Sequence, residues 1–172
     1  QSGSMATSVV YASIFAAVLA SLPAVSTKLV VFDTAVVDLT EELSDPIEVL
    51  FGTQLGGGTD INRALGYCQG LVRTPSETIL VLISDLYEGG NRQELLKRAA
   101  SIVNAGVQFV TLLALNDDGA PSYDHSITGA FTEMGITSFA CTPDLFPDLM
   151  AAAINKQNLA QWTSGQGVVA AR

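Results

Sequence analysis

Three short blocks of oxygen-bearing side chains stand out in this sequence. The first is Ser2-Gly3-Ser4, the second is Thr59 after three consecutive glycines, and the third is Asp85 in a Ser-Asp pair. Hydroxyl and carboxylate oxygens are the ligands that a hard cation such as Mg²⁺ prefers, usually with some water retained. Each block alone is as typical of a helix cap or a turn as of a metal site. Together they predict a metal-dependent binding module.

The elements that would position these blocks alternate between strands and helices. Residues 27–32 and 35–39 are predicted to be two strands joined by a tight turn, forming an antiparallel hairpin at a sheet edge. The unbroken apolar run at 78–83 is typical of a central parallel strand covered on both faces. Further strands are predicted at 107–115 and 136–140, and helices at 45–52, 61–72, 91–106, 126–134 and 143–154.

This order predicts a doubly wound, Rossmann-like α/β fold with a mostly parallel sheet, one antiparallel edge strand and right-handed crossovers. In such a sheet, sites form beyond the carboxyl ends of the strands, and all three blocks fall there. Asp60 is predicted to cap the helix that starts beside it. Glu88, on the same rim, is predicted to be a solvated loop charge.

Composition limits the classes of partner. A chain of 172 residues that is 48% hydrophobic can bury the core of one domain. With 8 Lys and Arg against 17 Asp and Glu, the net charge of -9 opposes binding to nucleic acid or anionic lipid. The cysteines, Cys68 and Cys141, lack CxxC spacing, so we expect two buried thiols rather than a disulfide framework or a zinc site. A cytoplasmic location is the simplest expectation.

The stretch from Met5 to Leu22 has the length of a targeting or membrane segment, and we weighed it as one. Serines and alanines dilute its hydrophobicity, Pro23 stops it, and no basic region precedes it. We therefore predict a buried helix here and no membrane contact.

The three blocks resemble the metal-ion-dependent adhesion site (MIDAS) of the von Willebrand factor A (VWA) domains. The pattern of that family is Asp-x-Ser-x-Ser after the first strand, a Thr in a later loop and an Asp after the fourth strand. Ser2 and Ser4 match the serines, Thr59 the threonine and Asp85 the aspartate. Ser-Gly-Ser-Met and Gly-Gly-Gly-Thr-Asp-Ile are most similar to the bacterial CoxE-like subgroup, whose members commonly work beside MoxR-type AAA+ ATPases.

The resemblance implies a function as well as a fold. Ser2, Ser4 and Thr59 would bind Mg²⁺ directly, with Mn²⁺ or Ca²⁺ as alternative ions, and Asp85 would hold a coordinated water. An acidic side chain of a protein partner, for example a MoxR-type AAA+ ATPase, would complete the coordination. The expected function is therefore metal-dependent protein binding and not catalysis.

The leading Asp and the first strand of that family are missing from this sequence. We expect a longer native protein, or a strand from another segment or chain, to fill the sheet between residues 27–32 and 78–83. Residues 1–157 are predicted to form the VWA-like domain and residues 158–172 a C-terminal tail.

Two other functions stay open. Asp33 follows a strand like the nucleophile of haloacid-dehalogenase-like phosphohydrolases, and the glycine run could bind a phosphate. However, that family needs a second Asp two residues later, where this sequence has Ala35, and no Walker-type motif is present. By the same reasoning His125 is not expected to be a catalytic base, because the sequence has no serine or cysteine nucleophile motif. A metal-independent scaffold domain is the third possibility.

Overall fold

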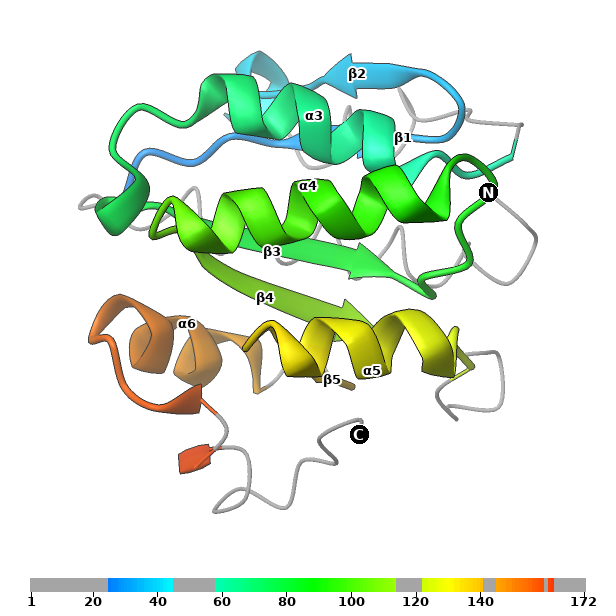
Figure 1. Cartoon of the computed structure of the whole chain (residues 1–172). Coiled ribbons are helices and arrows are strands. Elements are labelled where there is room, and N and C mark those ends of the chain that lie inside the picture. The colour runs from blue at the N-terminus through cyan, green and yellow to red at the C-terminus, as the bar shows by residue number, and fades with distance from the viewer. Residues whose placement is uncertain (1–24, 45–57, 114–121, 141–144, 160, 163–172) are drawn as a thin grey trace.

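The structure, a computed structural model, describes residues 25–44, 58–113, 122–140, 145–159 and 161–162 (Figure 1). The strands β1 (Val30–Phe32) and β2 (Val36–Asp38) form an antiparallel hairpin. A separate parallel sheet has the order β3 (Ile79–Ser84), β4 (Gln108–Leu113) and β5 (Thr137–Phe139). The predicted α/β class, the mainly parallel sheet and the antiparallel pair are confirmed.

Strand β4, and not β3, is the central strand of the parallel sheet. It pairs with β3 on one side and with β5 on the other, and it is buried from Phe109 to Leu113. Strand β3 pairs only with β4 among the described residues, and four of its six residues are only partly buried. Residues 79–84 thus form the predicted strand, and its side chains pack into clusters on both faces of the sheet, but β3 lies at the edge of the described sheet and not at its centre.

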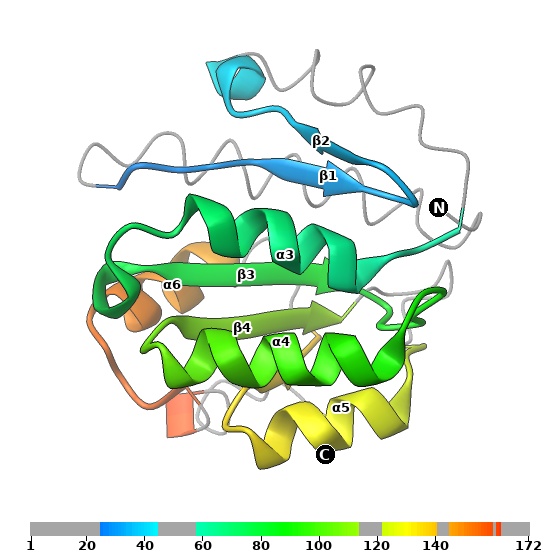
Figure 2. The same ribbon diagram turned by 45° about the horizontal axis from the view of Figure 1, so that its top comes forward.

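The hairpin and the parallel sheet are not joined by hydrogen bonds between β1 and β3 in the described part of the chain. The two strands nevertheless run in the same direction, and α3 (Ile61–Leu71) contacts β1 (Figure 2). Phe32 of β1 packs against the same core cluster as Leu82 of β3. This separation of β1 from β3 agrees with the expectation that another strand belongs between them.

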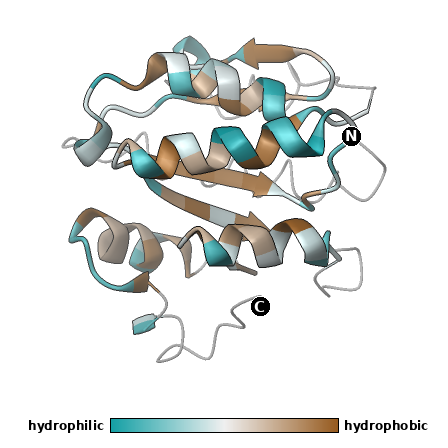
Figure 3. Cartoon of the chain, in the orientation of Figure 1, coloured by the Kyte–Doolittle hydropathy of each residue, from teal (hydrophilic) through white to brown (hydrophobic). Residues whose placement is uncertain are grey.

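Helices cover both faces of the parallel sheet. Leu82 and Phe109 pack on one face with α3, α4 (Arg92–Asn104) and α5 (His125–Glu133). Val110 and Phe139 pack on the other face with α6 (Phe146–Ile154), where Leu159 and Trp162 also contact the core. Figure 3 shows that β3 and β4 are mostly apolar, whereas α4 alternates between apolar and hydrophilic residues. This alternation is what a helix with one buried side requires.

Two short 3₁₀ turns, Glu41–Ser44 and Pro75–Glu77, complete the described elements. The predicted helix at 45–52 and the apolar stretch from Met5 to Leu22 lie outside the described residues. Among the helices that are described, none is long and apolar enough to cross a membrane.

Candidate metal and partner-binding site

The carboxyl ends of β1, β3 and β4 lie at the same edge as the first residues of α3, α4 and α5 (Figure 2). Backbone hydrogen bonds join the loops at this edge. The Gly89 amide donates to the carbonyl oxygen of Thr59 at 2.7 Å, and the Asp124 amide donates to that of Asp85 at 3.0 Å. The structure thus brings the loop of Thr59 and the loop that starts at Asp85 into direct contact, although residues 60–84 separate them in the sequence.

Asp85 lies in a sharp turn at the end of β3. Its Oδ1 atom accepts a hydrogen bond from the Tyr87 amide at 3.2 Å, and the hydroxyl of the buried Ser84 accepts one from the Leu86 amide at 3.0 Å. Leu86 has a φ of 62° and is fully buried. A leucine in this left-handed region is strained, so the packing of its side chain must outweigh the backbone cost.

The Asp85 carboxylate is half-buried, and burial raises its pKa. In the described part of the chain, the one ion pair is formed by Lys97 and Glu94, so no cationic side chain balances Asp85 there. A partly desolvated carboxylate without a cationic partner is more typical of a functional site than of a surface charge. A cation bound beside Asp85 would favour its ionised form.

Thr59 lies directly before α3, and two carboxylates cap this helix. Asp60 accepts a hydrogen bond from the Arg63 amide at 2.8 Å, which confirms the predicted N-cap. Glu88 accepts one from the Ile61 amide at 2.7 Å, and burial raises its pKa. The prediction that Glu88 is a solvated loop charge is therefore wrong, because its carboxylate is partly buried and accepts a hydrogen bond at the start of α3. The partner, Ile61, lies 27 residues away in the sequence.

The predicted ligand set is only partly within the described residues. Ser2 and Ser4 lie outside them, and Thr59 and Asp85 lie on two loops in contact. Within the described ranges, no three His, Cys, Asp or Glu side chains are grouped so that they could hold a metal ion. The described donors, one hydroxyl and one carboxylate, are oxygen atoms only, as a hard cation such as Mg²⁺ prefers.

Asp33 forms hydrogen bonds that stabilise the turn at the end of β1. It is buried, and its Oδ1 atom accepts a hydrogen bond from the Ala35 amide at 2.5 Å, within the turn that joins β1 to β2. Its carbonyl oxygen accepts one from the Asp60 amide at 2.9 Å, which ties the hairpin to the start of α3. These contacts favour the reading of Asp33 as a turn residue over that of a nucleophile.

His125 is the first residue of α5, and its ring lies 4.4 Å from that of Tyr123. Asp124 caps the helix by accepting hydrogen bonds from the amides of Ser126 and Ile127, both at 2.8 Å. The Asp124 carboxylate therefore serves the helix start, and a general-base pair with His125 gains no support from the geometry.

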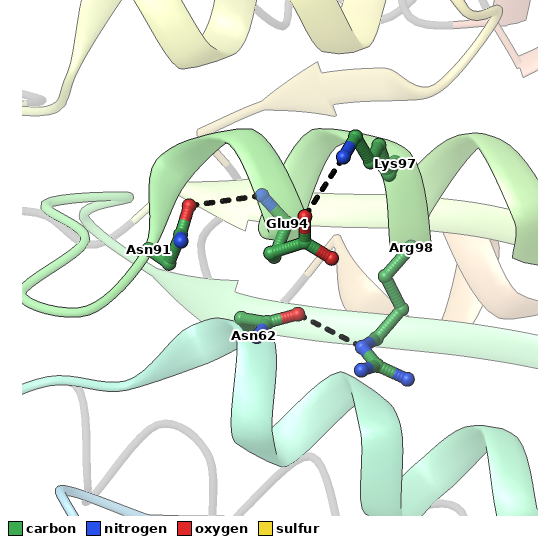
Figure 4. A network of polar contacts seen from close by, with 5 residues as sticks. All are labelled: Asn62, Asn91, Glu94, Lys97 and Arg98. Atoms are coloured by element: carbon green, nitrogen blue, oxygen red, sulfur yellow. Dashed lines mark hydrogen bonds and ion pairs between the residues drawn. The ribbon is translucent and has the colours of Figure 1, made fainter.

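Polar contacts between α3 and α4 fix the helix that follows Thr59 (Figure 4). Arg98 donates from Nε to the Asn62 side-chain oxygen at 2.8 Å, and a Cβ atom at Gly66 would lie 3.1 Å from the guanidinium carbon. The glycine thus gives the guanidinium room to lie against α3. At the start of α4, Asn91 accepts a hydrogen bond from the Glu94 amide at 3.1 Å.

Comparison with known proteins identifies a family and a relative that are similar to this chain. The family described as VWA domain containing CoxE-like protein matches residues 1–150. The uncharacterized protein YehP of Escherichia coli K12 is 41% identical over 143 residues, which are 83% of this chain and 38% of YehP. The chain thus spans less than two thirds of the length of that relative. No solved structure matches the chain.

Proposed function

Because the chain belongs to the family of VWA domain containing CoxE-like proteins, we propose that it is a metal-ion-dependent module that binds a protein partner. The family match confirms the VWA fold and the CoxE-like type that the three sequence blocks predict. The observation that carries the proposal is the contact between the Thr59 loop and the loop of Asp85, whose carboxylate is half-buried and lacks a cationic partner among the described residues.

In this proposal the hydroxyls of Ser2, Ser4 and Thr59 hold Mg²⁺ directly, and Asp85 holds a water bound to it. Mn²⁺ and Ca²⁺ are the alternative ions. When bound, the cation supplies a positive centre that neutral hydroxyl ligands leave largely uncompensated. The chain carries a net charge of -9, so an acidic partner would otherwise be repelled. The site thereby selects a partner that presents a carboxylate.

A MoxR-type AAA+ ATPase is the partner class that the CoxE-like family suggests. We propose binding and not catalysis as the role of this chain, because Asp33 and Asp124 are both engaged in turns or caps. The cytoplasm is the proposed location, since the spacing of Cys68 and Cys141 supports no disulfide framework and Cys68 is a free thiol.

The open edges of β1 and β3 support a second part of the proposal. Neither edge has a strand partner among the described residues, although α3 lies against the core shared by both strands. An extended segment from elsewhere in the native protein or from another chain would supply the missing backbone hydrogen bonds. Amide exchange along β3 in the native-length protein tests this, because amides that lack a partner in β4 should then become protected.

The function is tested by measuring binding to a MoxR-type ATPase by calorimetry, in Mg²⁺ and in EDTA. Thr59→Ala removes a proposed ligand without opening a core cavity, and should weaken binding as strongly as chelation does. Thr78→Ala is the matched control, because its hydroxyl lies at the opposite end of the sheet and donates to the Thr74 carbonyl. If binding persists both in EDTA and in Thr59→Ala, a metal-independent scaffold is the better description.

A further inference from the structure

The Glu88 carboxylate connects the two loops that the proposed site must hold together. Its Oε2 atom accepts a hydrogen bond from the Ile61 amide at 2.7 Å, and its Oε1 atom accepts one from the Gly90 amide at 3.1 Å. Ile61 is the first residue of α3, so Glu88 caps this helix from a different loop, while Asp60 caps it from its own. The two carboxylates together satisfy amides that a helix start leaves without intrahelical partners.

Gly89 leaves no space for a side chain, and a side chain at Gly90 would displace the Glu88 carboxylate. A Cβ atom at Gly89 would lie 2.7 Å from the carbonyl oxygen of Thr59, and one at Gly90 would lie 2.6 Å from Oε1 of Glu88. The Gly89 amide donates to that same oxygen of Thr59. The two backbones therefore approach more closely than residues with side chains would permit.

The charge of Glu88 has no cationic partner among the described residues, where Lys97 and Glu94 form the one ion pair. The nearby Asp60 carries a charge of the same sign, which opposes the ionised form of Glu88. Attraction between opposite charges thus does not explain why a carboxylate lies here. The hydrogen bond from the Ile61 amide does explain it, because it joins the loop to the helix start, and the bond from the Gly90 amide fixes the carboxylate within its own loop.

We infer that Glu88 is a positioning residue of the proposed metal site, and that it holds Thr59 against the loop of Asp85 through the Ile61 amide, while the Gly90 amide fixes the carboxylate within its loop. The inference rests on the proposed function, and it gives Glu88 no role as a metal ligand. Thr59 is two residues before Ile61 and Asp85 is three residues before Glu88, so both predicted site residues adjoin the connection. Residues outside a metal's ligand set commonly fix its ligands in this way.

The test uses the native-length protein and the variants Glu88→Gln and Glu88→Ala. Glutamine keeps the size of the side chain but can accept at only one of the two positions, and its amide group opposes the other donor. Asn91→Ala is the matched control, because Asn91 caps α4 within the same loop through the Glu94 amide. The two readouts are hydrogen exchange of the Ile61 and Gly90 amides without metal, and the affinity for Mn²⁺ alone.

Both Glu88 variants should lose protection at the Ile61 or Gly90 amide and bind Mn²⁺ about tenfold more weakly, whereas Asn91→Ala should change neither. Unchanged protection and unchanged affinity would overturn the inference. Weaker Mn²⁺ binding with full protection at both amides would also overturn it, since Glu88 would then act as a ligand. If the wild-type protein binds no Mn²⁺, the proposed function fails, whereas the exchange data report separately whether Glu88 joins the loops.

Discussion

The two ends of the parallel sheet are built from the same strands but differ in charge and burial. At the carboxyl end, Asp85 and Glu88 are partly buried carboxylates with raised pKa values, and the buried Leu86 has a positive φ. The amino end has a shallow, open depression that is lined by Ser76, Val103, Gly106, Val107, Gln108 and Lys156.

At the amino end, positive φ angles fall on Gly106, which has no Cβ atom and adopts this conformation without strain, and on the exposed Lys156 just after α6. At the carboxyl end the same kind of backbone conformation falls on Leu86, which is fully buried. Strained residues and desolvated charges persist only where the surrounding structure holds them, and they gather at functional sites. The comparison therefore supports the proposal of a functional site at the carboxyl end of the sheet.

Removal of the Leu86 side chain should have the largest effect on stability. Leu86 is fully buried in the cluster between the sheet and α3–α5, so Leu86→Ala should lower the free energy of unfolding by about 3 kcal/mol. Leu86→Gly should be no less stable than Leu86→Ala, because glycine relieves the positive φ. Urea denaturation of the three proteins measures both effects. If Leu86→Ala lowers the free energy of unfolding by less than about 1 kcal/mol, the loops at the carboxyl end of the sheet (the rim) are not anchored in the core.

Gly89 should tolerate a methyl group poorly. The Cβ atom of Gly89→Ala would lie 2.7 Å from the Thr59 carbonyl oxygen, so the loops must separate, with a loss of about 2 kcal/mol. Gly129→Ala is the control in the middle of α5, where nothing lies within 4 Å of the added atom. That variant should gain about 0.5–1 kcal/mol from helix propensity. Equal effects at the two glycines in thermal unfolding would contradict the close contact of the rim loops.

The pH dependence of stability should have opposite signs at Asp85 and Asp38. Burial raises the folded-state pKa of Asp85, so its contribution to stability is present below the unfolded-state pKa and is lost as the pH rises through the folded-state value. Asp85→Asn should therefore raise the melting temperature of the metal-free protein at pH 7 and have little effect at pH 3.

At Asp38 the hydrogen bond from Thr40 lowers the pKa, so the stabilisation is present above the unfolded-state value and is lost as the pH falls. Asp38→Asn should accordingly lower the melting temperature slightly at pH 7. If both substitutions shift the melting temperature in the same direction at pH 7, the distinction between a desolvated rim carboxylate and an ordinary hairpin carboxylate is lost.

The smallest effect is expected on the outer surface of α4. Lys97 pairs with Glu94 at 2.8 Å, but the two side chains are 71% and 50% exposed. Solvent and salt screen such a pair, so Lys97→Ala should leave the melting temperature unchanged within error. A clear loss of stability that disappears at high salt would show that surface ion pairs contribute more to the stability of this domain than the contacts at the rim do.

The positions of Thr59 and Asp85 could be predicted because both follow strong local patterns. A glycine run precedes the helix that begins at Ile61, and the apolar run of β3 ends at Ser84. Parallel strands bring their carboxyl ends to one edge, so two loops that are far apart in the sequence could be placed together. Ser2 and Ser4 lie outside the described residues, and their part in the site stays a prediction.

The role of Glu88 could not be predicted from local patterns, because a cap supplied from a distant loop has no fixed spacing in sequence. The glycine pair after Glu88 was the available signal, since adjacent glycines often mark a close backbone approach. The open edge of β3 agrees with the expectation of a further strand between residues 27–32 and 78–83. The apolar run by itself could not show it, because such a run looks the same in the sequence whether its strand has one neighbour or two.

The most direct test of the account is a calorimetric titration of the native-length protein with Mg²⁺, beside Thr59→Ala, Asp85→Ala and the amino-end control Thr78→Ala. We expect one ion per chain, an affinity about tenfold weaker in the two rim variants, and no change in Thr78→Ala. Binding of the same strength in all four proteins, or no binding in the wild-type protein, would contradict a metal site at the carboxyl edge of the sheet.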